Sequence, residues 1–81
     1  MEQELTLSTL ERGERAVISY VAGDDAVATR LGHLGFLPGT EIQTIRRAPF
    51  GDPTIYALRG NQMCLRRAET ERIIISPAEV A

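Results

Sequence analysis

The chain has 81 residues, a mass of 8.9 kDa and a formal net charge of −2, and its 9 basic residues are all arginine. This length fits one small domain, so we expect residues 1–81 to fold as a single unit. The slightly acidic balance argues against a nucleic-acid-binding protein, which would need a basic surface. The apolar content of 43% argues against a disordered chain.

The chain carries one cysteine, Cys64, which excludes an internal disulfide. Its first residues are acidic where a secretory signal would be basic. No apolar run approaches the roughly 20 residues that span a bilayer. We therefore expect a cytoplasmic protein that does not itself insert into a membrane.

The first half of the chain predicts a short N-terminal helical turn within residues 6–13, a strand over residues 15–21 and one α-helix over about residues 24–34. Asp24 and Asp25 suit the start of this helix because an aspartate can accept hydrogen bonds from free amide groups. Gly35 suits its end because glycine adopts a left-handed conformation without strain. A Pro-Gly turn follows at residues 38–39.

The second half predicts a strand over residues 41–47, a loop at residues 48–53 and then three more strands joined by two short turns. Ile42 and Ile45 have opposite parity in that strand, which indicates a β-bulge. Strands over residues 54–59 and 62–66 flank a Gly60-Asn61 turn, and a short turn at residues 68–71 leads to a last, largely buried strand over residues 72–76. Five strands and one helix favour a small, strongly bent barrel with the helix over one opening.

The sequence offers little for catalysis, and we expect no enzyme, no catalytic residue and no bound cofactor. A catalytic site needs a nucleophile, a base and a group that orients the base, but the chain has only His33 and Cys64. We interpret His33 as a solvated surface residue and Cys64 as a small apolar residue packed in its strand. There is no glycine-rich phosphate-binding motif.

A metal site within one chain is not expected either. Zinc needs several cysteine or histidine ligands at characteristic spacing, and none is present. Helix capping accounts fully for Asp24 and Asp25. A weak site shared between two chains is left open.

The surface offers two interpretations. Leu31, Leu34, Phe36 and Leu37, together with Phe50 in the loop at residues 48–53, supply more apolar bulk than a barrel lid needs. They either close the core or line a groove that accepts apolar side chains of a partner. The arginine pairs at residues 46–47 and 66–67 do not form two-arginine patches by themselves, because neighbours on a strand point to opposite faces. Their simplest role is solubility and protection of strand edges.

Several ordered motifs resemble the FeoA family over about residues 7–75. They are Leu7-x-x-Leu10-x-x-Gly13, Arg30-Leu31-x-x-Leu34-Gly35-Phe36-Leu37-Pro38-Gly39, Ala48-Pro49-Phe50-Gly51-Asp52-Pro53 and Leu65-Arg66-Arg67-x-Glu69. The resemblance implies an SH3-like β-barrel with an inserted helix. It also implies a non-enzymatic accessory protein of bacterial ferrous iron uptake and iron homeostasis, acting on FeoB, a membrane transporter with a cytoplasmic GTPase domain. That partner could recruit the chain to the inner face of the membrane.

On this basis we expect partner contacts at four apolar residues and two rim charges, namely Leu31, Phe36, Leu37, Phe50, Arg46 and Arg66. Phe36 and Phe50 depart from the family, in which smaller aliphatic residues are common at these places. The alternative is a metal-responsive regulatory domain that binds a divalent ion directly, because the same fold resembles the C-terminal domain of iron-dependent repressors. A chain that begins at Met1 without a helix-turn-helix region favours a stand-alone protein. The sequence leaves the oligomeric state open.

Overall fold

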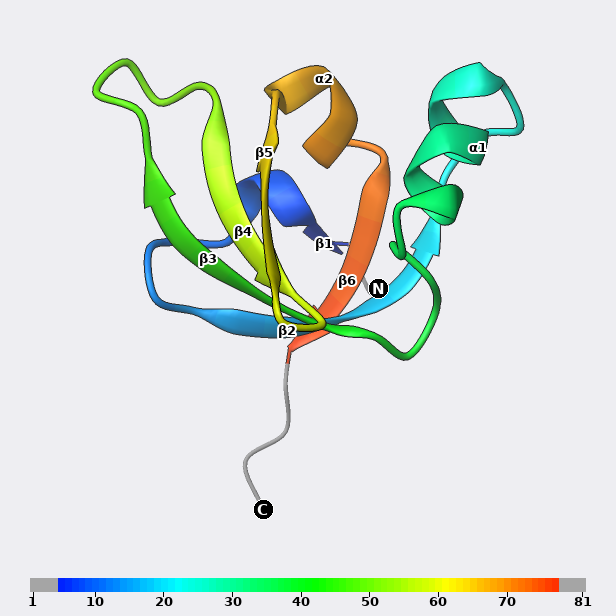
Figure 1. The fold of residues 1–81 in the computed structure, drawn as a ribbon, viewed down its shortest axis with the longest axis horizontal. Helices are drawn as coiled ribbons and strands as arrows, with labels where there is room; N and C mark the ends of the chain where they lie inside the picture. The colour runs from blue at the N-terminus through cyan, green and yellow to red at the C-terminus, as the bar shows by residue number, and fades with distance from the viewer. Residues whose placement is uncertain (1–4, 78–81) are drawn as a thin grey trace.

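A computed structural model describes residues 5–77, which form an antiparallel sheet with three short helices (Figure 1). The strand order is β1-β6-β2-β3-β4-β5. The strands are β1 Leu5–Thr6, β2 Arg15–Val21, β3 Glu41–Arg47, β4 Thr54–Leu58, β5 Asn61–Leu65 and β6 Ile73–Pro77. The helices are the 3-10 helix η1 Leu7–Thr9, the inserted helix α1 Ala26–His33 and the short helix α2 Arg67–Thr70.

The sheet curls around one core, as the SH3-like prediction requires (Figure 1). The register shifts between Ile18 and Tyr20 in the β2–β6 pair and between Thr44 and Arg46 in the β3–β4 pair. Such bulges bend and twist a strand, so they supply the curvature. The bulge predicted in β3 is confirmed. The curl stops short of a closed barrel, because β1 and β5 are not paired with each other in the described part of the chain.

The sheet has one strand more than predicted. The N-terminal helical turn is present as η1, but Leu5 and Thr6 before it pair with Ile75 and Ile74 of β6. The predicted turn at residues 68–71 is instead the short helix α2. Its first turn is stabilised by Glu69, whose Oε1 accepts a hydrogen bond from the backbone N–H of Arg66 at 3.0 Å.

The β4–β5 hairpin forms as predicted, but its turn lies one residue earlier than expected. Leu58 pairs with Asn61, so the two turn residues are Arg59 and Gly60, with φ of 52° and 83°. A two-residue turn of this kind needs positive φ at both positions. The earlier register also leaves Leu58 in the core, only 2% exposed, whereas the predicted strand end at Arg59 belongs to the turn.

Helix α1 is confirmed, two residues shorter at its start than predicted. Asp25 is the N-cap, and its side chain accepts a hydrogen bond from the N–H of Ala28 at 3.3 Å. Gly35 ends the helix with a φ of 106°. A Cβ atom at Gly35 would lie 3.3 Å from Leu58 Cδ2, so this position also lets the helix end approach the β4–β5 hairpin closely.

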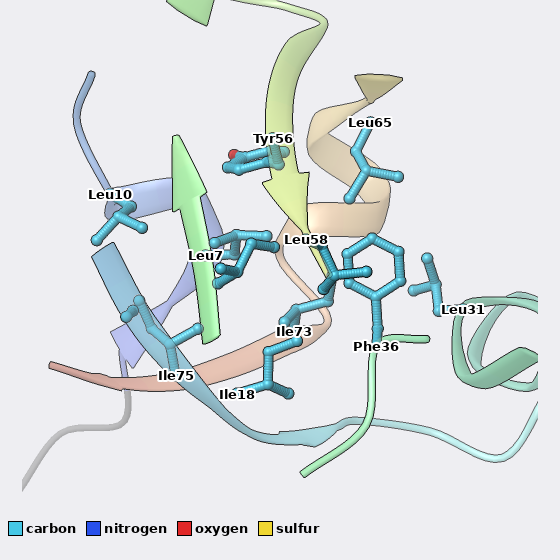
Figure 2. Close-up of a cluster of buried hydrophobic side chains, with 12 residues drawn as sticks. Leu7, Leu10, Ile18, Leu31, Phe36, Tyr56, Leu58, Leu65, Ile73 and Ile75 are labelled. Carbon is cyan, nitrogen blue, oxygen red and sulfur yellow. The ribbon is translucent and has the colours of Figure 1, made fainter. Parts of the chain in front are cut away.

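The core is formed by side chains from almost every element. Figure 2 shows Phe36 between Leu58 and Leu31, with Leu65 close by. All three isoleucines of β6 are buried, which confirms the prediction of a largely buried last strand. The other members of the cluster are Leu7, Leu10, Ala16, Ile18, Ile42 and Tyr56.

One buried group gives a stability prediction. Thr44 is fully buried, and its Oγ1 has no hydrogen-bond partner within residues 5–77. Because an unpaired buried hydroxyl costs free energy, Thr44→Val should raise the free energy of unfolding by about 1 kcal/mol, measured by urea denaturation. Thr70→Val is the matched control. The Thr70 hydroxyl donates to the carbonyl of Arg67 at 3.2 Å, so this change should lower stability, and the same sign for both variants would contradict the prediction.

Candidate partner-binding surface

Two of the expected partner contacts are buried, and the expectation is corrected for them. Leu31 is 0% exposed and Phe36 is 1% exposed, because both side chains fill the space between α1 and the β4–β5 hairpin (Figure 2). A partner that meets the folded chain cannot contact them. Of the two interpretations of these residues, closing the core is the correct one.

The other two apolar residues are exposed but do not form one groove. Leu37 is 45% exposed just after α1, and Phe50 is 98% exposed in the loop between β3 and β4. Figure 1 shows this loop on the opposite side of the molecule from α1. The expected continuous surface over the helix and the loop is therefore divided into two separate regions.

A groove that the sequence did not predict lies beside the loop that carries Phe50. It has a volume of about 440 Å³ and is lined mainly by apolar groups. Its lining residues are Arg46, Arg47, Ala48, Pro49, Pro53, Ile55 and Cys64. We call it the β4–β5 groove. In the structure Thr54, Tyr56 and Leu58 of β4 are buried, whereas Ile55 and Ala57 are partly exposed, so Ile55 lies on the outer face. The sequence of β4 carries no signal for this arrangement, because the polar Thr54 faces inward and the apolar Ile55 faces outward.

Cys64 lies on the outer face and not in the core, which corrects the prediction for it. Its register partner is Ile55, whereas the neighbouring Met63 pairs with the buried Tyr56 and packs against the core. Cys64 is exposed as a result. The Met63-Cys64-Leu65 pattern is apolar throughout, so the sequence could not show which parity faces inward.

Arg46 and Arg47 point to opposite faces of the sheet, as predicted. The bulge at Ile45 pairs Arg46 with Ile55 and Arg47 with the buried Thr54. Arg47 Nη2 donates to the backbone carbonyl of Leu10 at 2.5 Å and to that of Ser8 at 3.2 Å, and so ties β3 to η1. Both arginines still contribute to the β4–β5 groove, because β3 ends there.

The remaining rim charge, Arg66, is exposed at the start of α2. It lies at the end of β5 and follows the core residue Leu65. Within residues 5–77 the side-chain ion pairs are Arg30–Glu69 and Arg72–Asp25, so neither Arg46 nor Arg66 is neutralised by a described carboxylate.

The described part of the structure offers no metal centre. No group of three or more His, Cys, Asp or Glu within residues 5–77 could hold a metal ion, and His33 is exposed in the last turn of α1. A polar cavity beneath Arg47 and Tyr56 has a volume of about 10 Å³, room for about one water molecule. Burial raises the pKa of the Tyr56 hydroxyl there. No helix of the described residues is long and apolar enough to cross a membrane.

The start of α1 is held by an ion pair that gives a pH prediction. Arg72 Nη1 lies 2.5 Å from Asp25 Oδ1, and this hydrogen bond, with that from Ala28, lowers the pKa of the Asp25 carboxyl. The ionised Asp25 carboxylate therefore stabilises the folded state fully above its pKa in the unfolded chain, which is about 3.9. This stabilisation is lost as the pH falls through the lower pKa that Asp25 has in the folded chain. Asp25→Asn keeps a good N-cap but removes the charge.

We therefore expect the wild type to exceed Asp25→Asn in stability by a constant amount near about pH 6 and by progressively less below about pH 4. Urea denaturation over a pH series measures this difference. A difference that grows on acidification would have the wrong sign for a carboxyl whose pKa is lowered by folding.

Comparison with known proteins gives the family. Residues 5–77 match the FeoA domain. The chain belongs to the FeoA family. A fusion protein of Fe(2+) transport protein A and Fe(2+) transporter FeoB from Porphyromonas gingivalis is 33% identical over 69 residues, which cover 85% of this chain. The chain spans only 8% of the length of that relative.

Solved structures of FeoA proteins have the same fold. The FeoA protein from Chlorobium tepidum is 36% identical, with a TM-score of 0.85 over 93% of this chain and 71% of that one. The zinc-complexed FeoA of Stenotrophomonas maltophilia, an SH3 domain protein, is 32% identical, with a TM-score of 0.80 over 89% of each chain. A manganese-dependent transcriptional repressor shares the fold alone, at 12% identity and a TM-score of 0.84 over 96% of this chain and 38% of that one.

Proposed function

We propose that the chain binds the cytoplasmic part of an FeoB-type ferrous iron transporter and regulates its GTPase domain. The observation that carries this proposal is the relative in which an FeoA part and FeoB are one polypeptide. Covalent linkage raises the effective concentration of one domain near the other, which benefits two parts that work in contact. The chain would then act in the cytoplasm, at the inner face of the membrane where its partner lies.

The exposed members of the predicted set are the proposed contacts, namely Leu37, Phe50, Arg46 and Arg66. Phe50 is the strongest of them, because an almost fully exposed aromatic side chain gains much apolar contact when a partner covers it. Leu31 and Phe36 are buried in the core next to α1, and so they position only the contact that follows this helix, Leu37. Binding and regulation of this kind require no catalytic group in the chain.

The test measures binding of the full chain to a detergent-solubilised FeoB-type transporter from the same source. Phe50→Asp should weaken binding about tenfold or more, because it places a charge in the interface. Thr29→Asp, at an exposed position of α1, is the matched control and should bind like the wild type. A wild-type chain that does not bind the transporter would overturn the proposal.

Regulation is tested in the same preparation. The rate of GTP hydrolysis by the transporter should differ with and without saturating wild-type chain, and Phe50→Asp at equal concentration should leave the rate at its basal value. Equal rates with the wild-type chain bound would remove the regulatory part of the proposal and leave the binding part.

A further inference from the structure

We infer that the outer edge of β5 and the β4–β5 groove beside it bind one extended segment of the partner protein, which adds to the sheet as a further strand. The segment carries apolar side chains at alternate positions and at least one carboxylate. This inference rests on the proposed function, because the partner is the FeoB-type transporter, and it adds how that partner is held.

The first argument is the backbone of β5, which has one neighbouring strand, β4, within the described residues. Leu58 and Asn61 flank the two-residue turn, so they form a hydrogen-bonded pair, and such pairs alternate along an antiparallel ladder. The N–H and C=O groups of Gln62 and Cys64 therefore point away from β4. Both residues are exposed. Together they offer the donors and acceptors to which an extended chain can pair.

The second argument is that β5 lacks the features that prevent edge pairing. Proteins protect an exposed edge with charged residues, proline, bulges or very short strands. The strand Asn61–Leu65 contains no charged residue and no proline. Its pairing with β4 contains no β-bulge. At the other end of the strand order, β1 has two residues within the part of the chain that the structure describes. Among the described residues, β5 therefore presents the longer unprotected edge, and this edge is suitable for a further strand.

The third argument is the position of the groove. Cys64 belongs both to the β5 edge and to the lining of the β4–β5 groove, which it shares with Ile55. Side chains of an added strand alternate between the two faces of the sheet, so every second one would lie on the face of Cys64. Backbone pairing then provides affinity, and the apolar groove selects the side chain placed in it.

The fourth argument is charge, and it favours another protein over a second copy of this chain. Arg46 lines the groove without any carboxylate among the lining residues, and it forms no ion pair within residues 5–77, whereas the guanidinium of Arg47 is already bound to the carbonyls of Ser8 and Leu10. A carboxylate in the bound segment would complement Arg46. Pairing of β5 with the β5 of a second copy would not supply one, because that strand has no acidic residue.

The decisive variant is Gln62→Pro, compared with Gln62→Ala. Proline removes an N–H that points away from β4, so the β4–β5 ladder keeps its hydrogen bonds. Alanine removes the same side chain but retains the N–H. We expect Gln62→Ala to bind the detergent-solubilised transporter like the wild type and Gln62→Pro to bind about tenfold or more weakly, because a bound carbonyl loses its donor. Circular dichroism verifies that both variants are folded.

A second measurement uses the wild type alone and holds if the proline variant does not fold. Hydrogen exchange, followed by mass spectrometry, should show slower exchange in the peptide that spans β5 when the transporter is bound. Unchanged β5 exchange in the complex, or equal binding by a folded Gln62→Pro, would overturn this inference and leave the proposed function intact.

Two further outcomes are distinguishable. Absence of binding by the wild type would overturn the proposed function and this inference together. A chain that sediments as a dimer with its β5 amides already protected before the transporter is added would show that a second copy occupies the edge, and would overturn this inference alone.

Discussion

Replacing Phe36 with alanine should lower the free energy of unfolding by about 3–5 kcal/mol, the usual cost of removing a buried phenylalanine side chain. Phe36 is 1% exposed and lies between Leu31 and Leu58, so its loss leaves a cavity at the place where α1 rests on the hairpin. Small domains have total stabilities of about 5–15 kcal/mol, so the variant should lose much of its stability. Urea denaturation measures the change, provided that the slope of the transition is the same as in the wild type.

Phe50→Ala is the matched control, because the same side chain is removed from a position that is 98% exposed. Its free energy of unfolding should stay within about 0.5 kcal/mol of the wild type. Phe50→Ala should nevertheless bind the transporter more weakly than the wild type, although its stability is unchanged. A large loss of stability in Phe50→Ala, or none in Phe36→Ala, would contradict the assignment of one residue to the core and the other to the surface.

Replacing Arg47 with methionine should lower the free energy of unfolding by about 1–2 kcal/mol, whereas Arg46→Met should change it by no more than about 0.5 kcal/mol. Arg47 donates to the carbonyls of Ser8 and Leu10, and these acceptors lose a charged donor when it is replaced. Methionine preserves most of the side-chain volume, so the hydrogen bonds dominate the difference. The same urea series measures both variants.

The two arginine variants should also separate stability from binding. Arg46 lies on the outer face opposite Ile55, so Arg46→Met should weaken the complex with the transporter without affecting the fold. Equal losses of stability in the two variants would contradict the placement of the Arg46 and Arg47 side chains on opposite faces of the sheet.

Most of the fold was predictable because local signals agreed with the global arrangement. The Asp25 cap and Gly35 delimit α1, and the opposite parity of Ile42 and Ile45 marks the bulge. The register of the hairpin was missed by one residue because Arg59 adopts positive φ, which is uncommon for a residue other than glycine. Strand β1 was missed because its pairing with β6 depends on residues far away in the sequence.

The candidate surface was less predictable, for a physical reason. Whether Leu31 and Phe36 close the core or face a partner depends on how closely α1 approaches Leu58, and sequence spacing does not contain that distance. Cys64 was misplaced because both of its neighbours are apolar, so parity could not be assigned. The β4–β5 groove combines the end of β3, a loop and two strands, a juxtaposition that only the folded chain shows.

The position of β6 between β1 and β2 has a consequence for the order in which the domain can form. The meander from β2 to β5 pairs neighbours in the sequence, but Leu5 and Val17 reach their partners Ile75 and Ser76 only across most of the chain. During synthesis the N-terminal strands therefore emerge before the strand that joins them exists. The core can close only after the last strand has left the ribosome, so this domain completes its folding after translation of residue 77.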